Sequence, residues 1–540
     1  FQGVTDQLQK ITELAAAGKT EAWELLGRIT NQHRDATAEL ISERKSREEV
    51  LRYVDEILNE LTETCTGIFL LREITRHSRD SVLAAGERLS SRIICGFIEK
   101  SIYADASTFI RTDASAGENV VDFNITNKLI REKIGSSPQI TVVPGFIATT
   151  LTGEITTLGR GGSDYTAAII AAALGAEVLE IWTDVEGFMT ADPKKVEKAY
   201  TIESLTYAEA MELSHFGAKV IYTPTLRPVY KDRIPVRVKN TFNPEAKGTL
   251  INGDSKDESR SRIKGISSID HIDLVTLQGP AMVGITGTSA RLFGALAKRN
   301  VNIILITQAS SEYSITFAVA PSDAAAASAA INEEFAREIK SNNELKLVVE
   351  KNLSVIAIVG EKMKNTPGIS ATLFASLGRN GINVIATAQG SSELNISVVI
   401  RNEHLRKALN AIHDGFFLSP YDEVNLFVAG TGLVGSSLLK QLYKQAPMLL
   451  EEHYFKIRLI GLTNSRKMII DNKGIPLDSC RDKLRDEGIK ADIAGFVGQI
   501  KALNLRNSVF IDCTADPRVS EIYGEALTGY ISVVTANKIA

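Results

Sequence analysis

Residues 156–168 read TTLGRGGSDYTAA, a glycine-rich turn that lies between two segments of different character. The run PQITVVPGFIA at 138–148 predicts a strand, and SDYTAAIIAAALGA at 163–176 predicts a helix. The glycines let the backbone come close to a ligand, and Ser163 is a good helix N-cap. Free N–H groups and the positive dipole end of a helix start attract anions. The stretch therefore predicts an α/β domain with an anion-binding turn.

Charged side chains near this turn suit such a ligand. Arg160 offers a planar fork for a carboxylate or phosphate, and Asp164 could orient a charged group or a metal. Farther along, WTDVEGFMTADPKKV at 182–196 places Asp184 and Asp192 beyond a strand, where α/β sheets bind ligands. Each acid by itself is usually solvated surface, and the glycines by themselves could serve only a tight helix cap. The turn is not a Walker loop, because the Gly-Lys-Ser/Thr ending is missing.

Composition limits the classes of function. With 540 residues, of which 44% are hydrophobic and 23% charged, the chain suits a globular protein of about three or four domains. A net charge of −4 gives no reason to expect nucleic acid or a membrane as partner. The cysteines are scattered without a CxxC pair, so we expect no disulfide framework, no zinc site and a cytoplasmic location. No apolar run approaches the ~18 residues that span a bilayer. Both ends look cut within a domain, so we expect a piece of a longer protein.

The pattern of the sequence changes along the chain. Residues 1–110 show apolar residues three and four apart, as in EEVLRYVDEILNEL at 48–61, and predict helices. From 138 strands and helices alternate, ending in a predicted strand pair at 232–251. The polar run GDSKDESRSR at 253–262 is predicted to be a linker.

Two stretches of the middle region repeat each other. GTSARLFGALAKRNVNIILITQASSEYSITFAV from Gly287 aligns with GISATLFASLGRNGINVIATAQGSSELNISVVI from Gly368, and each predicts helix, strand, turn, strand. Two copies are too few for a solenoid, so they indicate a duplicated small α/β domain. An amide both donates and accepts, so repeated glutamines can read the ammonium and carboxylate groups of an amino acid. The alternative is that the Ser-Ser-Glu after each glutamine only caps a turn. The candidate ligand-binding residues are Asn302, Gln308, Asn383 and Gln389.

A second glycine turn follows in the last part of the chain. VAGTGLVGSSLL at 428–439 is a G-x-G-x-x-G after a predicted strand and before a predicted helix, the context of a dinucleotide site. The next strand ends in Asn-Ser-Arg-Lys at 464–467 rather than in an acid, which favours the 2′-phosphate of NADP. Alternatively, Arg466 and Lys467 are only surface charges. The candidate cofactor residues here are Gly430, Gly432, Leu433, Val434, Gly435, Arg466 and Lys467.

The first block resembles the aspartokinases of the amino-acid kinase fold. The resemblance lies in LGRGGSDYTAA, WTDVEGF with T-x-DP, FGAKV with PTL, and in GVTD at 3–6, AGERLSSRI at 85–93 and RTDA at 111–114. It implies a parallel-rich sheet between helices and phosphorylation of the aspartate side chain by ATP with Mg²⁺, with no metal ligands assigned. The family's opening Lys-Phe-Gly-Gly-Thr-Ser strand would precede Phe1. The residues implied for aspartate are Thr5, Glu87, Arg160 and Ser163; for the nucleotide Thr183, Asp184, Met189, Asp192 and Lys219; and for catalysis Asp164 and Arg160.

The other two blocks extend the resemblance. The duplicated domains resemble the ACT regulatory pair of aspartokinases, in which one ferredoxin-like α+β copy interrupts the other; stretches 351–360 and 394–414 are candidates for the exchange. VFIDCTADPRV and VVTANKIA resemble homoserine dehydrogenase, and imply that Cys513, Thr514, Asn537 and Lys538 edge the nicotinamide in a partial Rossmann domain. We expect kinase, ACT pair and NADP-binding domain at residues 1–260, 261–418 and 419–540.

This order of parts resembles the bifunctional aspartokinase–homoserine dehydrogenases. The resemblance implies aspartate and aspartate semialdehyde as substrates, ATP and NADP(H) as cofactors, threonine as effector, and a homodimer or homotetramer. Two alternatives stay open from the sequence. One is an amino-acid sensor with inert kinase and dehydrogenase remnants, and the other is a lysine-regulated kinase with an unrelated nucleotide-binding tail.

Overall fold

The structure of the chain is a computed structural model, and it forms two compact units. The first comprises Phe1–Phe188, Glu203–His215 and Lys219–Asp257, and the second comprises Met189–Ile202, Phe216–Ala218 and Glu258–Ala540. The structure describes all residues except 2, 114–119, 136–137, 218–219, 254–261, 309–312, 341–344, 418–421, 453–454, 506 and 540. Most of the linker expected at 253–262 therefore lies outside the described residues. Within the described part, no helix is both long and apolar enough to cross a membrane.

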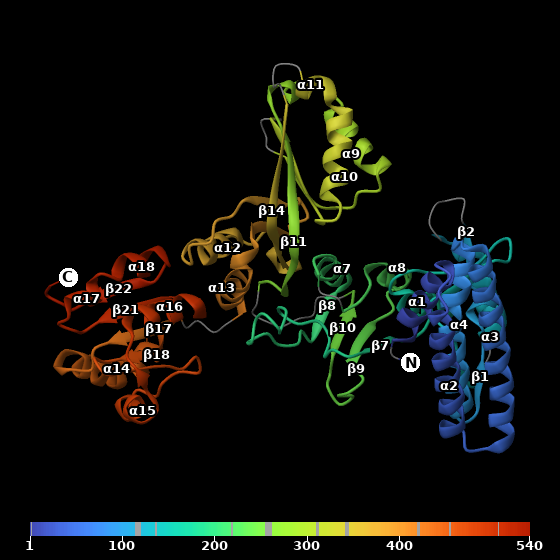
Figure 1. Cartoon of the computed structure of the whole chain (residues 1–540), viewed down its shortest axis with the longest axis horizontal. Helices are drawn as coiled ribbons and strands as arrows, with labels where there is room; N and C mark the ends of the chain where they lie inside the picture. Colours follow the sequence, from blue (N-terminus) through green and yellow to red (C-terminus); the bar gives the residue numbers. More distant parts are fainter. Residues whose placement is uncertain are drawn as a thin grey trace. The chain divides into compact units, whose positions relative to one another are not determined.

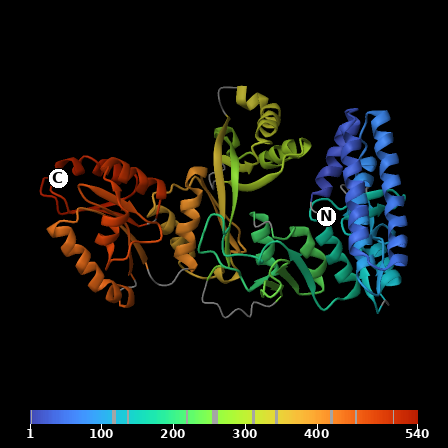
Figure 2. The same ribbon diagram turned by 60° about the horizontal axis from the view of Figure 1, so that its bottom comes forward.

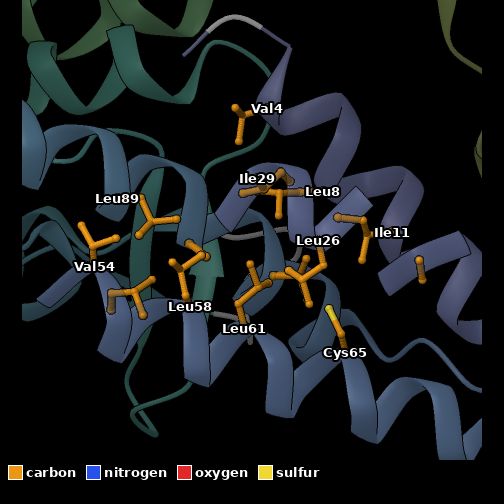
Figure 3. Packing of buried hydrophobic residues seen from close by; sticks show 14 of the residues in the cluster. Val4, Leu8, Ile11, Leu26, Ile29, Val54, Leu58, Leu61, Cys65 and Leu89 are labelled. Carbon is orange, nitrogen blue, oxygen red and sulfur yellow. The ribbon is translucent and has the colours of Figure 1, made fainter. Parts of the chain in front are cut away.

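Four helices open the first unit, as the apolar spacing predicts. They are α1 (Val4–Ala16), α2 (Glu21–Leu40), α3 (Arg44–Leu71) and α4 (Arg76–Phe97). They run side by side, shown in blue in Figure 2. In α3 the buried residues recur every three or four positions, so that one face of the helix meets its neighbours (Figure 3). Leu8, Ile29 and Leu89 fill the centre of this core, which makes the helices one packed layer.

Short strands and helices complete the first unit. Its sheets have the orders β3-β2-β5-β6, β7-β9-β10-β8 and β1-β4, and parallel pairs outnumber antiparallel pairs, which agrees with the expected kinase fold. PQITVVPGFIA forms two strands rather than one, because Pro144 and Gly145 interrupt it. The elements are β1 (Ser101–Tyr103), β2 (Arg111–Asp113), β3 (Val120–Val121), α5 (Phe123–Ile134), β4 (Ile140–Val142), β5 (Ile147–Thr150), β6 (Ile155–Thr157), α6 (Gly162–Leu174), β7 (Leu179–Thr183), β8 (Ser204–Thr206), α7 (Tyr207–His215), α8 (Leu226–Lys231), β9 (Val236–Asn240) and β10 (Thr249–Asn252).

A buried carboxylate anchors the strand that leads into the first glycine turn. Asp80 on α4 is 6% exposed. Its oxygens accept hydrogen bonds from the Thr156 hydroxyl at 3.0 Å and from the N–H and hydroxyl of Thr157 at 3.3 and 3.2 Å. Burying an ionised carboxylate is favourable only when such donors surround it. Asp80 thereby joins the helical layer to the end of β6, directly before the turn.

The duplicated region folds around two long strands. β11 (Gly265–Gln278) and β14 (Lys346–Val359) run antiparallel at the centre of the sheet β12-β13-β11-β14-β16-β15 (Figure 1). The first copy adds α9 (Thr288–Lys298), β12 (Ile303–Gln308), β13 (Ser314–Val319), α10 (Ala324–Glu334) and α11 (Ala336–Lys340). The second copy adds α12 (Ile369–Gly378), β15 (Ala386–Gln389), β16 (Asn395–Arg401) and α13 (Leu405–Phe417). Both copies have the predicted order of helix, strand, turn, strand.

The two copies share strands, as the expected exchange requires. Ile266 in the first half of β11 packs with Ile356 and Ile358 of β14 in the core of the second copy. Val275 and Leu277 in the second half of β11 pack in the core of the first copy. The stretches 351–360 and 394–414 both return to complete the second copy, which the first copy interrupts, because Ile358, Ile396 and Leu405 pack with Ile266 in one core.

The last part of the second unit has a mostly parallel sheet of order β20-β19-β18-β17-β21-β22. The strands β18, β17, β21 and β22 are parallel, and apolar clusters cover both faces of the sheet. The elements are β17 (Asp422–Ala429), α14 (Leu433–Glu451), β18 (Phe455–Thr463), β19 (Lys467–Ile470), α15 (Cys480–Glu487), β20 (Ile489–Lys490), α16 (Ile493–Leu503), β21 (Ser508–Asp512), α17 (Pro517–Ser520), α18 (Tyr523–Thr528) and β22 (Ser532–Thr535).

Candidate functional site

A cavity of about 580 Å³ opens in the first unit beside the first glycine turn. It lies between α4 and α6, and the turn between β4 and β5 closes one side. Two residues predicted to bind aspartate, Glu87 and Ser163, both line it. A Cβ atom on Gly145 would come within 2.8 Å of the Ser163 Cα, so glycine is required for this close approach. The other polar lining residues are Ser90, Ser91, Thr141 and Thr166.

Burial shapes the charge of this region. Burial is the largest effect on Glu87 and raises the pKa of its carboxyl group. Burial also raises the pKa of Asp164, which lies in the first turn of α6. A desolvated carboxylate is stabilised by a cation, so the cavity suits a ligand that carries an ammonium group next to Glu87.

The glycine turn differs in one detail from the prediction. The helix α6 begins at Gly162, and its N-cap is Gly161 with φ of 66°, so Ser163 is not the cap but lies in the first turn. A Cβ atom at Gly161 would lie 2.3 Å from the Cβ of Tyr222, which explains why a serine does not occupy the cap. Arg160 is exposed in the turn and is not part of the cavity lining. Thr5 is also exposed and lies on α1, outside the lining.

The residues predicted for the nucleotide fall in both units. Thr183 ends β7, and its hydroxyl donates to the Asp184 carboxylate at 3.1 Å in the first unit. Met189 and Asp192 belong to the second unit, and Lys219 lies outside the described residues. The nucleotide site stays a prediction.

The repeated glutamines end corresponding strands of the regulatory sheet. Gln308 is the last residue of β12 and Gln389 the last of β15, and these are the two edge strands. The edges meet, because the Thr307 hydroxyl donates to the Thr387 carbonyl at 3.0 Å. Both predicted amide positions therefore lie close to one junction, at the ends of strands that follow Asn302 and Asn383. Residues 309–312 lie outside the described part of the chain.

Glu393 of the second Ser-Ser-Glu contacts two turns. Its N–H donates to the Gly390 carbonyl at 3.0 Å within its own turn, and Glu393 has a φ of 54°. Its carboxylate accepts a hydrogen bond from the Asn365 N–H of a separate loop at 2.9 Å.

A cavity of about 1490 Å³ lies at the carboxyl ends of the parallel strands of the last sheet. Its lining includes Gly430, Gly432, Leu433 and Val434, while Gly435 lies behind the turn. A Cβ atom at Gly435 would lie 1.8 Å from the carbonyl oxygen of Gly430, whereas one at Gly432 would meet nothing within 4 Å. The turn is thus packed on its inner side and open toward the cavity, where the N-terminus of α14 begins. These residues fit a dinucleotide pyrophosphate.

The basic residues after β18 have different environments. Arg466 lines the cavity, and its N–H and that of Lys467 donate to the Asn464 side chain at 2.8 Å each. Lys467 does not line the cavity, and its ammonium group donates to the Arg485 carbonyl. Of the two predicted phosphate ligands, only Arg466 is therefore placed to reach a bound ligand.

A buried acid that the sequence reading did not single out organises the far end of this cavity. Cys513, Thr514, Asn537 and Lys538 all line it. Asp512 is fully buried, and it accepts hydrogen bonds from the Thr514 N–H at 2.7 Å and the Asn537 amide at 3.2 Å. The feature of the sequence that could have identified Asp512 is its position at the end of the VFID strand. Within the described residues, no group of three or more His, Cys, Asp or Glu side chains could hold a metal ion.

The chain thus comprises an α/β domain with a small cavity beside its glycine turn, a duplicated α/β domain, and a domain whose glycine turn has the form of a dinucleotide-binding turn. Residues 3–240 match the amino acid kinase family, residues 275–335 and 356–416 the ACT domain, and residues 430–540 the homoserine dehydrogenase NAD binding domain. The chain therefore combines an amino acid kinase domain, an ACT pair and a homoserine dehydrogenase NAD binding domain, the parts for which the bifunctional aspartokinase/homoserine dehydrogenases are named.

Similar proteins support this assignment. The chain is 36% identical to bifunctional aspartokinase/homoserine dehydrogenase 1, chloroplastic, of Arabidopsis thaliana, over 99% of the chain and 60% of that protein. It is 37% identical to the bifunctional enzyme of Haemophilus influenzae, over 87% of the chain and 59% of that protein. The chain thus spans about 60% of the length of the curated relatives it matches.

A solved structure gives the same picture for the first two parts. Escherichia coli aspartokinase III in complex with aspartate and ADP matches with a TM-score of 0.64 and 27% identity, covering 77% of this chain and 91% of that one. The expected fold class is therefore confirmed. Residues 430–540 match the homoserine dehydrogenase NAD binding domain, and this match excludes the alternative of an unrelated nucleotide-binding tail.

The open side of the second glycine turn gives a test. In Gly432→Ala the methyl group enters empty space at a φ of −72°, so the protein should fold normally. The same methyl group should displace a pyrophosphate from the turn and weaken NADPH binding by about tenfold or more. Calorimetric titration measures the affinity, and circular dichroism confirms the fold. In Gly435→Ala, by contrast, the clash with Gly430 should lower stability as well. Unchanged NADPH affinity in Gly432→Ala would contradict the dinucleotide site.

Proposed function

We propose that the chain is the kinase, regulatory and cofactor-binding portion of an enzyme with two activities. The first activity is ATP-dependent phosphorylation of L-aspartate to 4-phospho-L-aspartate. The second is NADP-dependent reduction of aspartate semialdehyde to homoserine. The observation that carries the proposal is the order of three family matches along one chain, together with the likeness to an aspartokinase bound to aspartate and ADP.

The cavity of the first unit supports aspartate as the substrate. In this proposal Glu87 binds the α-amino group, because a desolvated carboxylate gains most from an ammonium partner. Ser163, Arg160 and Thr5 bind the carboxylates, and Asp164 at the start of α6 helps to organise the transfer. ATP with Mg²⁺ supplies the phosphoryl group, and Thr183, Asp184, Met189, Asp192 and Lys219 hold the nucleotide. Phosphoryl transfer needs mainly positioning and charge neutralisation, which these side chains supply.

Substitution of Glu87 tests this assignment. Glu87→Gln keeps the shape and removes the charge, so we expect aspartate affinity to fall about tenfold or more, because hydrogen bonds between charged groups contribute about 1.5–3 kcal/mol. Affinity for Mg-ATP should change little. Calorimetric titration of both ligands, with a coupled assay of aspartyl phosphate formation, measures the effect. Glu73→Gln, an exposed residue before α4, is the matched control. Equal loss of aspartate and Mg-ATP binding in Glu87→Gln would show that Glu87 serves the fold instead.

The large cavity supports NADP(H) as the second cofactor. Arg466 lines the cavity at the end of β18, where an acid would bind the ribose hydroxyls of NAD. A guanidinium group there binds the 2′-phosphate of NADP. Cys513, Thr514, Asn537 and Lys538 line another part of the cavity and would edge the nicotinamide. The Asp512 carboxylate holds the Thr514 N–H and the Asn537 side chain. NADPH, when bound, supplies the hydride.

The cofactor preference can be measured directly. Arg466→Ala should weaken NADPH binding about tenfold or more and leave NADH binding nearly unchanged, because only NADPH carries the phosphate. Arg518 provides a control of equal charge at the same cavity, since its guanidinium group is paired with Asp516 at 2.6 Å. Arg518→Ala should affect both cofactors alike. Fluorescence titration with each cofactor gives the affinities. An equal effect of Arg466→Ala on NADPH and NADH would refute the phosphate role.

The duplicated domain supports feedback control by an amino acid. We propose threonine as the effector, as the resemblance to the bifunctional enzymes implies. We propose that Gln308 and Gln389 bind it together with Asn302 and Asn383, because the glutamines end edge strands that meet. Lysine is the second candidate, since the T-state structure of Escherichia coli aspartokinase III, with a TM-score of 0.62, is a complex with lysine and aspartate. We further propose a homodimer or homotetramer. A cytoplasmic location agrees with the bacterial relative, although the plant relatives are named chloroplastic.

Single substitutions separate the two copies. Gln308→Ala and Gln389→Ala should each weaken threonine inhibition if their own copy binds threonine, because each removes one amide that reads the amino acid. Aspartate turnover without effector should be unchanged. Inhibition curves with threonine and with lysine measure both points. Loss of basal turnover together with inhibition would show that the glutamines are structural, and inhibition by lysine alone would favour the second candidate.

A further inference from the structure

A segment of the kinase region lies in the core of the regulatory region. Residues 189–202 read MTADPKKVEKAYTI and belong to the second compact unit. Ala191 and Val196 are 2% and 1% exposed, and they pack in the core of the second ACT copy. The segment also carries Met189 and Asp192, two of the residues proposed for the ATP site. Part of that site is therefore built on the regulatory fold.

Thr190 is the polar centre of this packing. It is 1% exposed. Its N–H donates to the Tyr200 carbonyl at 2.9 Å, and its carbonyl accepts from the N–H of Ile266 on β11 at 2.8 Å. Its hydroxyl oxygen accepts from the Tyr200 N–H at 3.2 Å and lies 2.9 Å from Nε2 of His413 on α13. The backbone of Thr190 is thus fixed by a strand of the second ACT copy, and its side chain by a helix of the same copy.

His413 is suited to this contact. Its side chain is fully buried, with the ring of Phe417 at 4.9 Å and that of Tyr200 at 6.4 Å. Burial, aided by the charge of Lys198, lowers its pKa to about 4, so the ring is neutral at neutral pH. Its Nδ1 has no hydrogen-bond partner among the described residues. An apolar ring would fill the space without leaving a polar atom unpaired, so the contact with Thr190 explains why a histidine stands here.

Other contacts hold the same segment. The Asn410 amide on α13 donates to the Lys195 carbonyl at 2.9 Å, and the Lys195 ammonium contacts the Asp270 carboxylate on β11 at 2.6 Å. Asp192 itself accepts from the Lys194 N–H at 3.0 Å, so its side chain is oriented by its own turn. The position of that turn is set by Thr190, two residues earlier.

We propose that His413 is a positioning residue for the kinase nucleotide site, which holds Met189 and Asp192 in place through Thr190. The inference rests on the proposed kinase function. It places a residue of the second ACT copy, far from the kinase motifs in sequence, among the determinants of nucleotide affinity. A displacement of about 1 Å in a positioning segment can lower activity as much as 100-fold, so a single hydrogen bond here has consequences at the site.

Two substitutions at His413 separate the hydrogen bond from packing. The amide of Gln reaches the position of Nε2, whereas that of Asn reaches only the position of Nδ1. Calorimetric titration of the full chain with Mg-ADP should show about tenfold weaker binding in His413→Asn, the effect of about one lost hydrogen bond at a buried site. His413→Gln should retain most of the affinity. Aspartate and threonine affinities should be unchanged in both variants.

Controls keep the test decisive. His33 is equally buried, on α2, with Nδ1 2.7 Å from the Ile29 carbonyl, so His33→Asn should lower the melting temperature without changing Mg-ADP affinity. If His413→Asn does not fold, Thr190→Val and Thr190→Ser replace the pair. Valine removes the hydroxyl and should weaken Mg-ADP binding, whereas serine keeps it and should not.

The outcomes are distinguishable. Equal Mg-ADP affinity in the unmodified chain and in His413→Asn would overturn this inference alone. Equal loss in the Asn and Gln variants, or a parallel loss of aspartate binding, would show that His413 only fills the core and would also overturn it. Failure of the unmodified chain to bind Mg-ADP would overturn the proposed kinase function, and this inference with it.

Discussion

The antiparallel ladder between β11 and β14 is the interaction on which the regulatory region depends. The ladder joins Gly265 to Val359 at one end and Gln278 to Lys346 at the other, with register shifts near Ile272 in between. Each strand contributes one half to each ACT core, so neither copy has a complete core without the other. The start of β11 also contacts the kinase segment, because the Ile266 N–H donates a hydrogen bond to the Thr190 carbonyl. One pair of strands therefore joins both ACT copies and residues 189–202 of the kinase region.

The two glycine turns solve the same physical problem in different ways. Each lies at the N-terminus of a helix without a side-chain N-cap, so no capping side chain occupies the N–H groups that an anion could bind. At Gly161 the glycine is required by the neighbouring Tyr222, whereas at Gly435 it is required by the turn's own carbonyl. The first turn lies beside a small cavity lined by the half-buried Glu87, and the second opens into a larger cavity lined by Arg466. These differences support a small amino acid in one site and a dinucleotide in the other.

Local pattern predicted much of this structure. The spacing of apolar residues and glycines along the chain predicts three features. These are the helices of residues 1–110, the duplicated units of helix, strand, turn and strand, and the dinucleotide turn. The break at Pro144 differs from the prediction of one strand in PQITVVPGFIA, because proline cannot donate within a sheet. Serine is a preferred cap, so the pattern predicts Ser163 as the N-cap of α6, but packing against Tyr222 favours glycine at position 161, two residues earlier.

Long-range placement could not be predicted. Nothing near Thr190 in the sequence indicates that its hydroxyl meets His413, more than two hundred residues later. The same is true of Asp80 and Thr156, and of Asp512 and Asn537, in which a buried polar group finds its partner only in the folded chain. Sequence motifs single out the residues that are proposed to contact ligands, while the residues that hold them in place carry no local signature.

The central claim is that the segment with Met189 and Asp192, two residues of the proposed nucleotide site, packs in the core of the second ACT copy. Titration of Mg-ADP with and without saturating threonine tests it most directly. The account predicts that threonine weakens Mg-ADP binding by about 5- to 150-fold, and that Mg-ADP weakens threonine binding by the same factor, as linkage with a coupling of 1–3 kcal/mol requires. Threonine that binds the chain and leaves the Mg-ADP affinity unchanged would contradict it.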